Sequence, residues 1–206
     1  MKIKALKLKE SLLEEGNLSE AIEEKASRLR FANQKLAVDQ EACYFDECLF
    51  ENVKLSGKMQ ACSLIDVVFL NCDLSLLDIE GSFLRRVRFE RCRMNAFNAI
   101  SCRLEDVVVT SCNCMYANFN EAKIKNVLLE SSSFVEAGLA MMDNKGLAVE
   151  GCDFCGAEFF DTSLSSCDFS TSKIEGIVFR QEDLKGMTVN AVQAVGLVEA
   201  LGVKVQ

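Results

Sequence analysis

A five-residue rhythm of apolar side chains runs through most of this chain and constrains its fold more than any other feature. From Met59 to Val189 every fifth residue is apolar, with Asn144 as the polar exception. Neither a helix nor an ordinary strand has this period. A second series, two residues before each of these positions, consists mostly of small side chains such as Ala117. Because residues two apart on an extended backbone point to the same side, each pentad places one large and one small side chain inward before the chain turns.

A longer period indicates how many sides the coil has. Val67, Val87 and Val107 recur every twenty residues, as do Cys72 and Cys92. Like residues therefore stack on like residues after four pentads, which predicts a four-sided solenoid. Its backbone hydrogen bonds would run along the axis between successive coils.

Several pentads also match a known motif of a small residue, a polar residue and a central Leu or Phe. They are Cys72-Asp73-Leu74, Ala117-Asn118-Phe119, Cys152-Asp153-Phe154 and Cys167-Asp168-Phe169. In these residues the chain resembles the pentapeptide repeat family, and the resemblance implies an all-β fold, a right-handed quadrilateral β-helix. An earlier set of pentads, over residues 43 to 55, is one residue out of phase. We therefore expect one residue to be missing near Ser56 to Met59, at a corner.

The ends of the chain differ from the repeats, so we expect three parts: an N-terminal helical and capping segment over residues 1–40, the solenoid over 41–189, and a C-terminal helix and tail over 190–206. Asn17-x-x-Glu20 is a plausible capping box for a helix over Leu18 to Arg30. Phe31 and Leu36 could instead begin the solenoid, and the sequence leaves both readings open. Near the other end, Asn190 is a good N-cap for a helix over residues 191 to 201.

Composition favours a non-catalytic protein of the cytoplasm. The chain has no histidine, which removes the commonest general base and many zinc sites. It lacks a glycine-rich phosphate loop and a nucleophile elbow, so we expect no enzyme activity, no cofactor and no catalytic residue. It has no apolar run of the ~18 to 20 residues that a membrane span needs, and we expect neither a membrane partner nor a secretory signal.

Cysteine placement also argues against metal binding. Of eleven cysteines, most occupy the small inward position, where a thiol packs as a compact hydrophobe. Cys112-x-Cys114 and Cys152-x-x-Cys155 look like ligand or redox motifs when taken alone. In register, however, Cys112 and Cys114 face a dry core and Cys155 turns outward from Cys152. We therefore expect free thiols and no metal site.

The C-terminal segment adds a second, narrower resemblance. Residues 182–187, 193–194 and 201–203 are similar to the closing segment of the quinolone-resistance pentapeptide proteins that bind DNA gyrase. That resemblance implies a homodimer formed through Val192, Val195, Leu197, Val198 and Leu201. The alternative is that this apolar helix only caps the last coil of a monomer.

Charge supplies the main argument about partners. The net charge is −8, and the acids concentrate in the later repeats, at Glu130, Glu136, Asp143, Glu150, Asp153, Glu158, Asp161 and Asp168. Over residues 130–183 this amounts to about one net negative charge per ~1.6 Å of axis, near the ~1.7 Å of B-DNA. One hypothesis is therefore a DNA mimic that binds gyrase or topoisomerase IV and protects against quinolones. Surface acids also keep a hydrophobic stack soluble, and a scaffold or adaptor with flat β faces is the alternative function.

Early arginines, Arg85 to Arg103, form a basic zone in the first coils. They could contact nucleic acid or an acidic protein. The acidic net charge nevertheless opposes general DNA binding, and we expect a protein partner.

Overall fold

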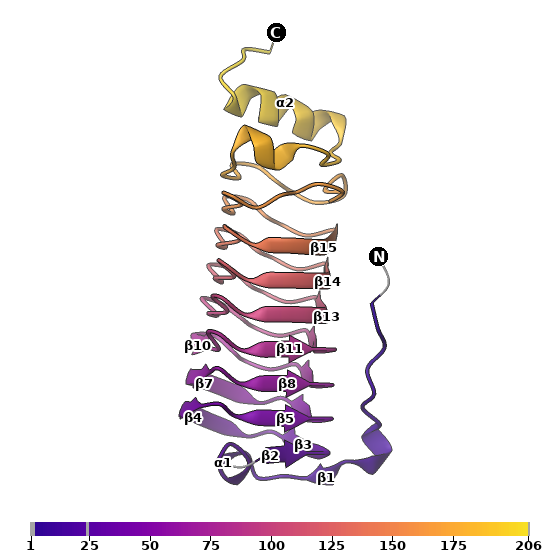
Figure 1. Ribbon diagram of the computed structural model, residues 1–206, viewed down its shortest axis with the longest axis vertical. Helices are drawn as coiled ribbons and strands as arrows, with labels where there is room; N and C mark the ends of the chain where they lie inside the picture. Colours follow the sequence, from indigo (N-terminus) through magenta and orange to yellow (C-terminus); the bar gives the residue numbers. More distant parts are fainter. Residues whose placement is uncertain (1–2, 24, 206) are drawn as a thin grey trace.

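The chain forms a long rod of stacked coils with a helix across its C-terminal end (Figure 1). The computed structural model describes residues 3–23 and 25–205. Its strands are β1 (Glu14–Glu15), β2 (Lys25–Ser27), β3 (Leu29–Ala32), β4 (Lys35–Glu41), β5 (Tyr44–Asp46), β6 (Leu49–Glu51), β7 (Lys54–Gln60), β8 (Ser63–Ile65), β9 (Val68–Leu70), β10 (Leu77–Asp78), β11 (Phe83–Arg85), β12 (Arg88–Glu90), β13 (Arg103–Thr110), β14 (Lys123–Glu130) and β15 (Asp143–Glu150). Its helices are α1 (Leu18–Ala21), α2 (Ala191–Ala200) and two 3-10 turns, Glu10–Leu12 and Gln181–Leu184.

Parallel stacking with a twenty-residue register confirms the predicted four-sided solenoid. Arg103 pairs with Lys123 and Lys123 with Asp143, each on the same side of the next coil. We name the sides by their buried central residues: face A has Leu84 and Leu104, face B has Phe89 and Val109, face C has Met94 and Cys114, and face D has Ala99 and Phe119. Faces A and B are extended strands through β15, whereas faces C and D of the upper coils join through isolated bridges.

The N-terminal region differs from the expected helix. That helix is confined to α1 (Leu18–Ala21), which Asn17 caps by accepting a hydrogen bond from the Ser19 N–H. From Lys25 onward the chain forms strands, and β2 already pairs in parallel with β5. The solenoid therefore begins before residue 41, and Phe31 is one of its core residues.

The missing residue near Ser56 to Met59 is confirmed, and the same shortening occurs once more below it. β4 and β7 pair with a register of nineteen residues, Lys35 with Lys54, whereas β7 and β10 pair with a register of twenty, Gly57 with Leu77. Both β4 and β7 run straight across the corner between faces C and D. Gly57 has φ +95°, and a Cβ there would lie 2.2 Å from the Val38 carbonyl oxygen, so the close approach requires glycine.

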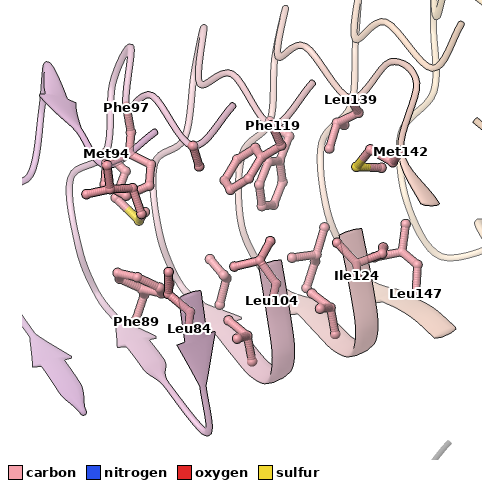
Figure 2. A pocket seen from close by; sticks show the side chains of 17 residues that line it. Leu84, Phe89, Met94, Phe97, Leu104, Phe119, Ile124, Leu139, Met142 and Leu147 are labelled. Atoms are coloured by element: carbon pink, nitrogen blue, oxygen red, sulfur yellow. The ribbon is translucent and has the colours of Figure 1, made fainter. Parts of the chain in front are cut away.

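A continuous apolar core runs along the axis. Phenylalanine rings stack between coils, with centroid separations of 4.6 Å for Phe50 and Phe69 and 5.1 Å for Phe69 and Phe89. The stacking is interrupted near the middle, where Leu104 and Ile124 line a small apolar cavity of about 30 Å³ (Figure 2). Ten of the cysteines are buried and Cys155 is partly exposed, and all are free thiols. The inward placement of the repeat thiols is therefore confirmed.

The strand ladder stops above β15. β15 pairs with β14 on one edge, and among the described residues no strand or bridge covers its other edge. In the coil above, residues 163–170, faces A and B change from strand to turns. Asn144, the polar exception in the repeat, spans the junction with its side-chain amide, which donates to the Ser163 carbonyl (2.9 Å) and accepts from the Gly146 N–H (3.1 Å). Side-chain hydrogen bonds replace the backbone ladder at this position.

The C-terminal helix α2 forms as predicted. The Asn190 side chain accepts a hydrogen bond from the Gln193 N–H, and the Asn190 N–H donates to the Gln193 side-chain oxygen. The Gln193 amide also donates to the carbonyls of Phe169 and Ser172. These contacts hold α2 across the last coil.

Candidate interaction surfaces

Face B contains a column of carboxylates. Glu90, Thr110, Glu130 and Glu150 follow one another in register on β12 to β15. Asp168 lies on the same face one coil higher, beside Phe169. Glu90 has Arg88 at 3.9 Å and Glu130 accepts from the Thr110 hydroxyl at 3.1 Å. Within the described residues, Glu130, Glu150 and Asp168 form no ion pair.

The other predicted acids are spread over the remaining sides of the rod. Asp143 lies on face A, Asp153 on face C and Glu158 on face D, while Glu136 and Asp161 lie at corners. The charges therefore do not form one uniform acidic surface.

Three of these acids are also neutralised by a neighbouring base. Lys145 lies 2.8 Å from Asp143, Lys173 lies 3.1 Å from Asp153, and Arg180 pairs with Asp161. Burial raises the pKa of Asp153, but hydrogen bonds from Cys155 and Lys173 outweigh it and leave that pKa below its ordinary value. The carboxylate is therefore ionised at neutral pH, and its charge is locally balanced.

Face A has the opposite sign. Arg103, Lys123 and Lys145 line a surface groove of about 360 Å³ together with Lys125, Glu105 and Asp143. Arg103 pairs with Glu105 at 2.5 Å on β13, and Lys145 pairs with Asp143 on β15. Lys123 and Lys125 of β14 lie between these two ion pairs. Of this basic surface, only the arginine zone was predicted from the sequence. In the sequence, the lysines that extend this surface can be found from the twenty-residue period, which places Lys123 above Arg103 and Lys125 above Glu105.

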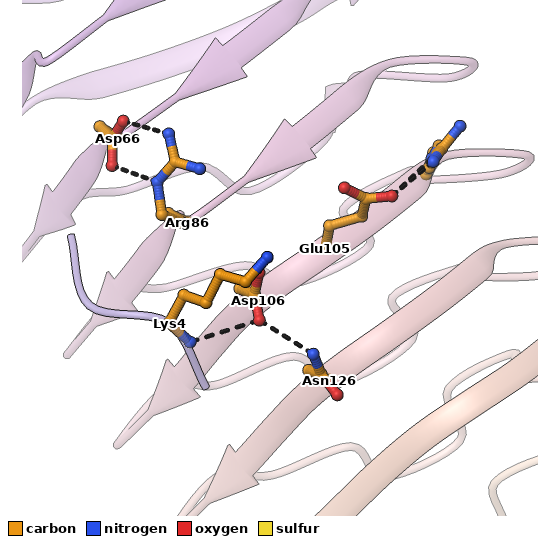
Figure 3. A network of polar contacts seen from close by, with 7 residues as sticks. Lys4, Asp66, Arg86, Glu105, Asp106 and Asn126 are labelled. Atoms are coloured by element: carbon orange, nitrogen blue, oxygen red, sulfur yellow. Dashed lines mark hydrogen bonds and ion pairs between the residues drawn. The ribbon is translucent and has the colours of Figure 1, made fainter. Parts of the chain in front are cut away.

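Between faces A and B runs a ladder of polar corner residues, which we call the A–B corner: Asp66, Arg86, Asp106 and Asn126. The corner residues Asp66, Asp106 and Asn126 have φ near +54°, at 53°, 55° and 55°, in the left-handed region that Asp and Asn tolerate. Arg86 donates to both carboxylate oxygens of Asp66, at 2.6 and 2.5 Å, and Asn126 donates to Asp106 at 3.0 Å (Figure 3).

The exposed side of α2 is apolar. Val192, Val195, Val198 and Leu201 are exposed, Val192 to 83%. Leu197, the fifth residue of the proposed dimer interface, packs partly against the core instead. A groove of about 380 Å³ lies between α2 and the last coil, lined by Ile174, Phe179, Val192, Val195 and Leu197 among others. The helix thus seals the core with one side and leaves a valine-rich side uncovered.

No group of three or more His, Cys, Asp or Glu side chains suited to a metal ion occurs among residues 3–23 and 25–205. In the same part of the chain, no helix is both long and apolar enough to cross a membrane.

The five-residue repeat, the twenty-residue parallel register and the four-sided core give the chain the fold of the pentapeptide repeat proteins, a quadrilateral β-helix. No protein-family model and no curated protein matches the chain.

Solved structures of low identity do match. A trypsin-treated variant of QnrB1, described as a plasmid-mediated fluoroquinolone resistance protein, is 22% identical, with 89% of this chain and 100% of that chain covered and a TM-score of 0.38. Full-length QnrB1 is 19% identical, with coverages of 87% and 99% and a TM-score of 0.35. HetL, a pentapeptide repeat protein involved in heterocyst differentiation regulation in the cyanobacterium Nostoc sp. strain PCC 7120, is 14% identical, with coverages of 79% and 88% and a TM-score of 0.32.

Proposed function

We propose that this protein is a non-catalytic binding module of the cytoplasm that recognises a protein partner through face B. In its most specific form, the proposal is a DNA mimic that binds a type II topoisomerase, gyrase or topoisomerase IV, and protects it from quinolones. The observation that carries the proposal is the column of Glu90, Glu130 and Glu150 on one flat face, with Asp168 on the same face one coil higher, in the neighbouring column above Ala148. A DNA-binding groove presents Lys and Arg side chains to a line of phosphates, and face B offers a line of carboxylates to the same side chains.

The spacing of these carboxylates determines how many phosphates of DNA they could replace. Glu130 and Glu150 lie on adjacent coils, about 4.8 Å apart along the axis, and Glu90 lies two coils below Glu130, about 9.6 Å away. One strand of DNA carries a phosphate per ~3.4 Å of axis. Face B would therefore replace some of the phosphates of a single strand, and its contribution would be electrostatic steering and orientation.

The uncovered side of α2 supports a homodimer as part of this proposal. A second copy would cover Val192, Val195, Val198 and Leu201, which a monomer leaves in water. Two solenoids joined at α2 would double the length of the rod and place both acidic columns toward its centre.

The direct test is gyrase supercoiling in the presence of the purified protein, with and without a fluoroquinolone. Glu130→Gln/Glu150→Gln/Asp168→Asn should weaken inhibition or protection by at least about tenfold, since three contacts of ~0.5 kcal/mol each amount to that factor. Glu136→Gln/Glu158→Gln/Asp153→Asn removes the same charge from other sides and should change little. No effect of the unaltered protein at micromolar concentration would eliminate the topoisomerase proposal.

The second candidate is a scaffold or adaptor without a topoisomerase role. The ion pairs of Asp143, Asp153 and Asp161 favour this second candidate. Each pair has no net charge, so these three acids add little to an acidic surface. In that case the protein neither inhibits gyrase supercoiling nor protects gyrase from a fluoroquinolone, and the two triple variants behave alike in every binding assay.

A further inference from the structure

An extended N-terminal arm lies along the A–B corner. Residues 3–9 descend beside the solenoid from its upper coils to the 3-10 turn Glu10–Leu12 near its base (Figure 1). The Lys7 N–H donates to Asp66 Oδ1 at 2.9 Å and the Lys4 N–H donates to Asp106 Oδ1 at 3.3 Å. Lys4 Nζ also lies 3.8 Å from Asp106 Oδ2 (Figure 3). The solenoid thus recognises this arm through its backbone.

The arm and the corner share a repeat length. Three residues of extended chain span ~10 Å, and two coils of the solenoid span ~9.6 Å. Asp66 and Asp106 are two coils apart, and Lys7 and Lys4 are three residues apart. A segment in the polyproline II conformation, which has three residues per turn and rises ~9.3 Å per turn, would therefore present an N–H to each carboxylate, whatever its side chains are.

The acceptors are preformed. Asp66 is 2% exposed and Asp106 is 5% exposed. Burial raises the pKa of Asp66, but its bonds to Arg86 and to the Lys7 N–H lower it by more, so the carboxylate is ionised. Asp66 also accepts from Arg86, and Asp106 also accepts from Asn126. Neither carboxylate therefore has the arm as its only partner.

The arm itself is lightly held. Ile3, Leu6 and Leu8 are only partly buried, and the lysines between them are exposed. Only two backbone N–H groups of residues 3–8 donate to the solenoid. The free energy needed to open a segment with few buried contacts is far smaller than the free energy of global unfolding.

The corner continues beyond the part of the arm described. Two coils above Asp106 the corner residue is Gly146, and here a groove of about 430 Å³ is lined by Asn144, Gly146, Leu147, Ser165, Ser166 and Asp168, among others. The groove borders the uncovered edge of β15, so backbone groups are available where the carboxylates end. A segment longer than the arm has room to continue.

We propose that the A–B corner is a binding track for an extended, lysine-rich polypeptide segment, and that the N-terminal arm is its ligand in cis. The partner is a basic tail of another protein, which binds by displacing the arm. Recognition combines N–H groups spaced three residues apart with lysines whose charges lie near Asp66 and Asp106, as those of Lys7 and Lys4 do. This inference is independent of a topoisomerase partner.

The test uses the full chain and a labelled peptide of residues 1–13. Lys4→Pro/Lys7→Pro in the chain removes the two donors in cis, because proline has no N–H. This variant should bind the peptide, by fluorescence anisotropy, at least about tenfold more tightly than the unaltered chain, in which the arm competes. The matched control Ala5→Pro adds a proline at a position whose N–H donates to no described residue and should behave as the unaltered chain. A peptide with prolines at positions 4 and 7 should not bind.

Two results would overturn the proposal. One is a folded Lys4→Pro/Lys7→Pro protein that fails to bind the unaltered peptide. The other comes from hydrogen exchange on the unaltered protein, which needs no variant. Lys4 and Lys7 amides that exchange only as slowly as those of β13 would show a permanent part of the fold and no displaceable ligand.

Discussion

Every residue in this solenoid has its most important neighbours about twenty positions away, and the A–B corner shows what that does for buried charge. Asp66 receives two bonds from Arg86, one coil above. Arg86→Met should destabilise the protein by about 3 to 5 kcal/mol, because it leaves a buried carboxylate without its cation. Urea unfolding measures this. Arg91→Met, whose guanidinium is exposed and bonded to Asn71, is the control and should cost less than about 0.5 kcal/mol.

The same carboxylate predicts an acid-sensitive component of stability. The pKa of Asp66 in the fold lies below its value of about 3.9 in an unfolded chain. Its contribution is therefore fully present above about pH 4 and is lost as the pH falls through the lower folded value. Asp66→Asn should remove that component from melting temperatures measured between pH 2 and 6. Identical pH profiles for the two proteins would refute the assignment.

Cys155 is the one partly exposed thiol, yet we expect it to react slowly. Burial, together with hydrogen bonds to Asp153 and Glu175, raises its pKa to about 12. Since the thiolate is the nucleophile, alkylation at pH 8 should modify Cys155 before the other cysteines, but far more slowly than a solvent-exposed thiol with an ordinary pKa. The buried cysteines should react only after unfolding. Glu175→Gln should accelerate it. Mass spectrometry after timed labelling distinguishes these outcomes, and rapid labelling of Cys155 would contradict them.

At the scale of elements, α2 has two unlike sides, one packed on the last coil and one lined by exposed valines. Val192→Asp should weaken self-association at least tenfold if a second copy covers this side, because the association would have to bury an unpaired charge. Light scattering across a concentration series measures it. Lys204→Glu, in the tail beyond the helix, is the control. A protein that is monomeric at all concentrations would restrict α2 to capping.

The sequence predicted some elements well and others poorly, for identifiable reasons. The repeat beyond Met59 determined the coil, its four faces and the inward thiols, because each pentad repeats the same local geometry. The N-terminal coil was obscured, since the shortening at β4 and β7 shifts Phe31 and Phe45 out of phase with the later repeats. A good N-cap at Asn17 was correct locally but opens only a four-residue helix. The arm could not be predicted, because Lys4 and Asp106 are 102 residues apart and no periodicity links them.

At the scale of the whole molecule, the rod has adjacent faces of opposite sign. Face A contains the β14 lysines and face B the glutamate column. Neither was evident from net charge, which averages over all sides. The basic face A and the acidic face B become distinct only when each residue is assigned to a face by its position within the twenty-residue coil. That assignment requires the fold.

We expect the uncovered edge of β15 to weaken the coupling between the coils on either side of it. A solenoid ordinarily unfolds as a chain of coupled neighbours, and the coupling weakens where Asn144 and other side chains replace the backbone ladder on two sides. Residues 163–205 should therefore melt before the coils below them, leaving a shorter rod that is still folded. Deuterium uptake measured by peptide should show two plateaus that meet near Thr162, and under tension the molecule should lengthen in two steps.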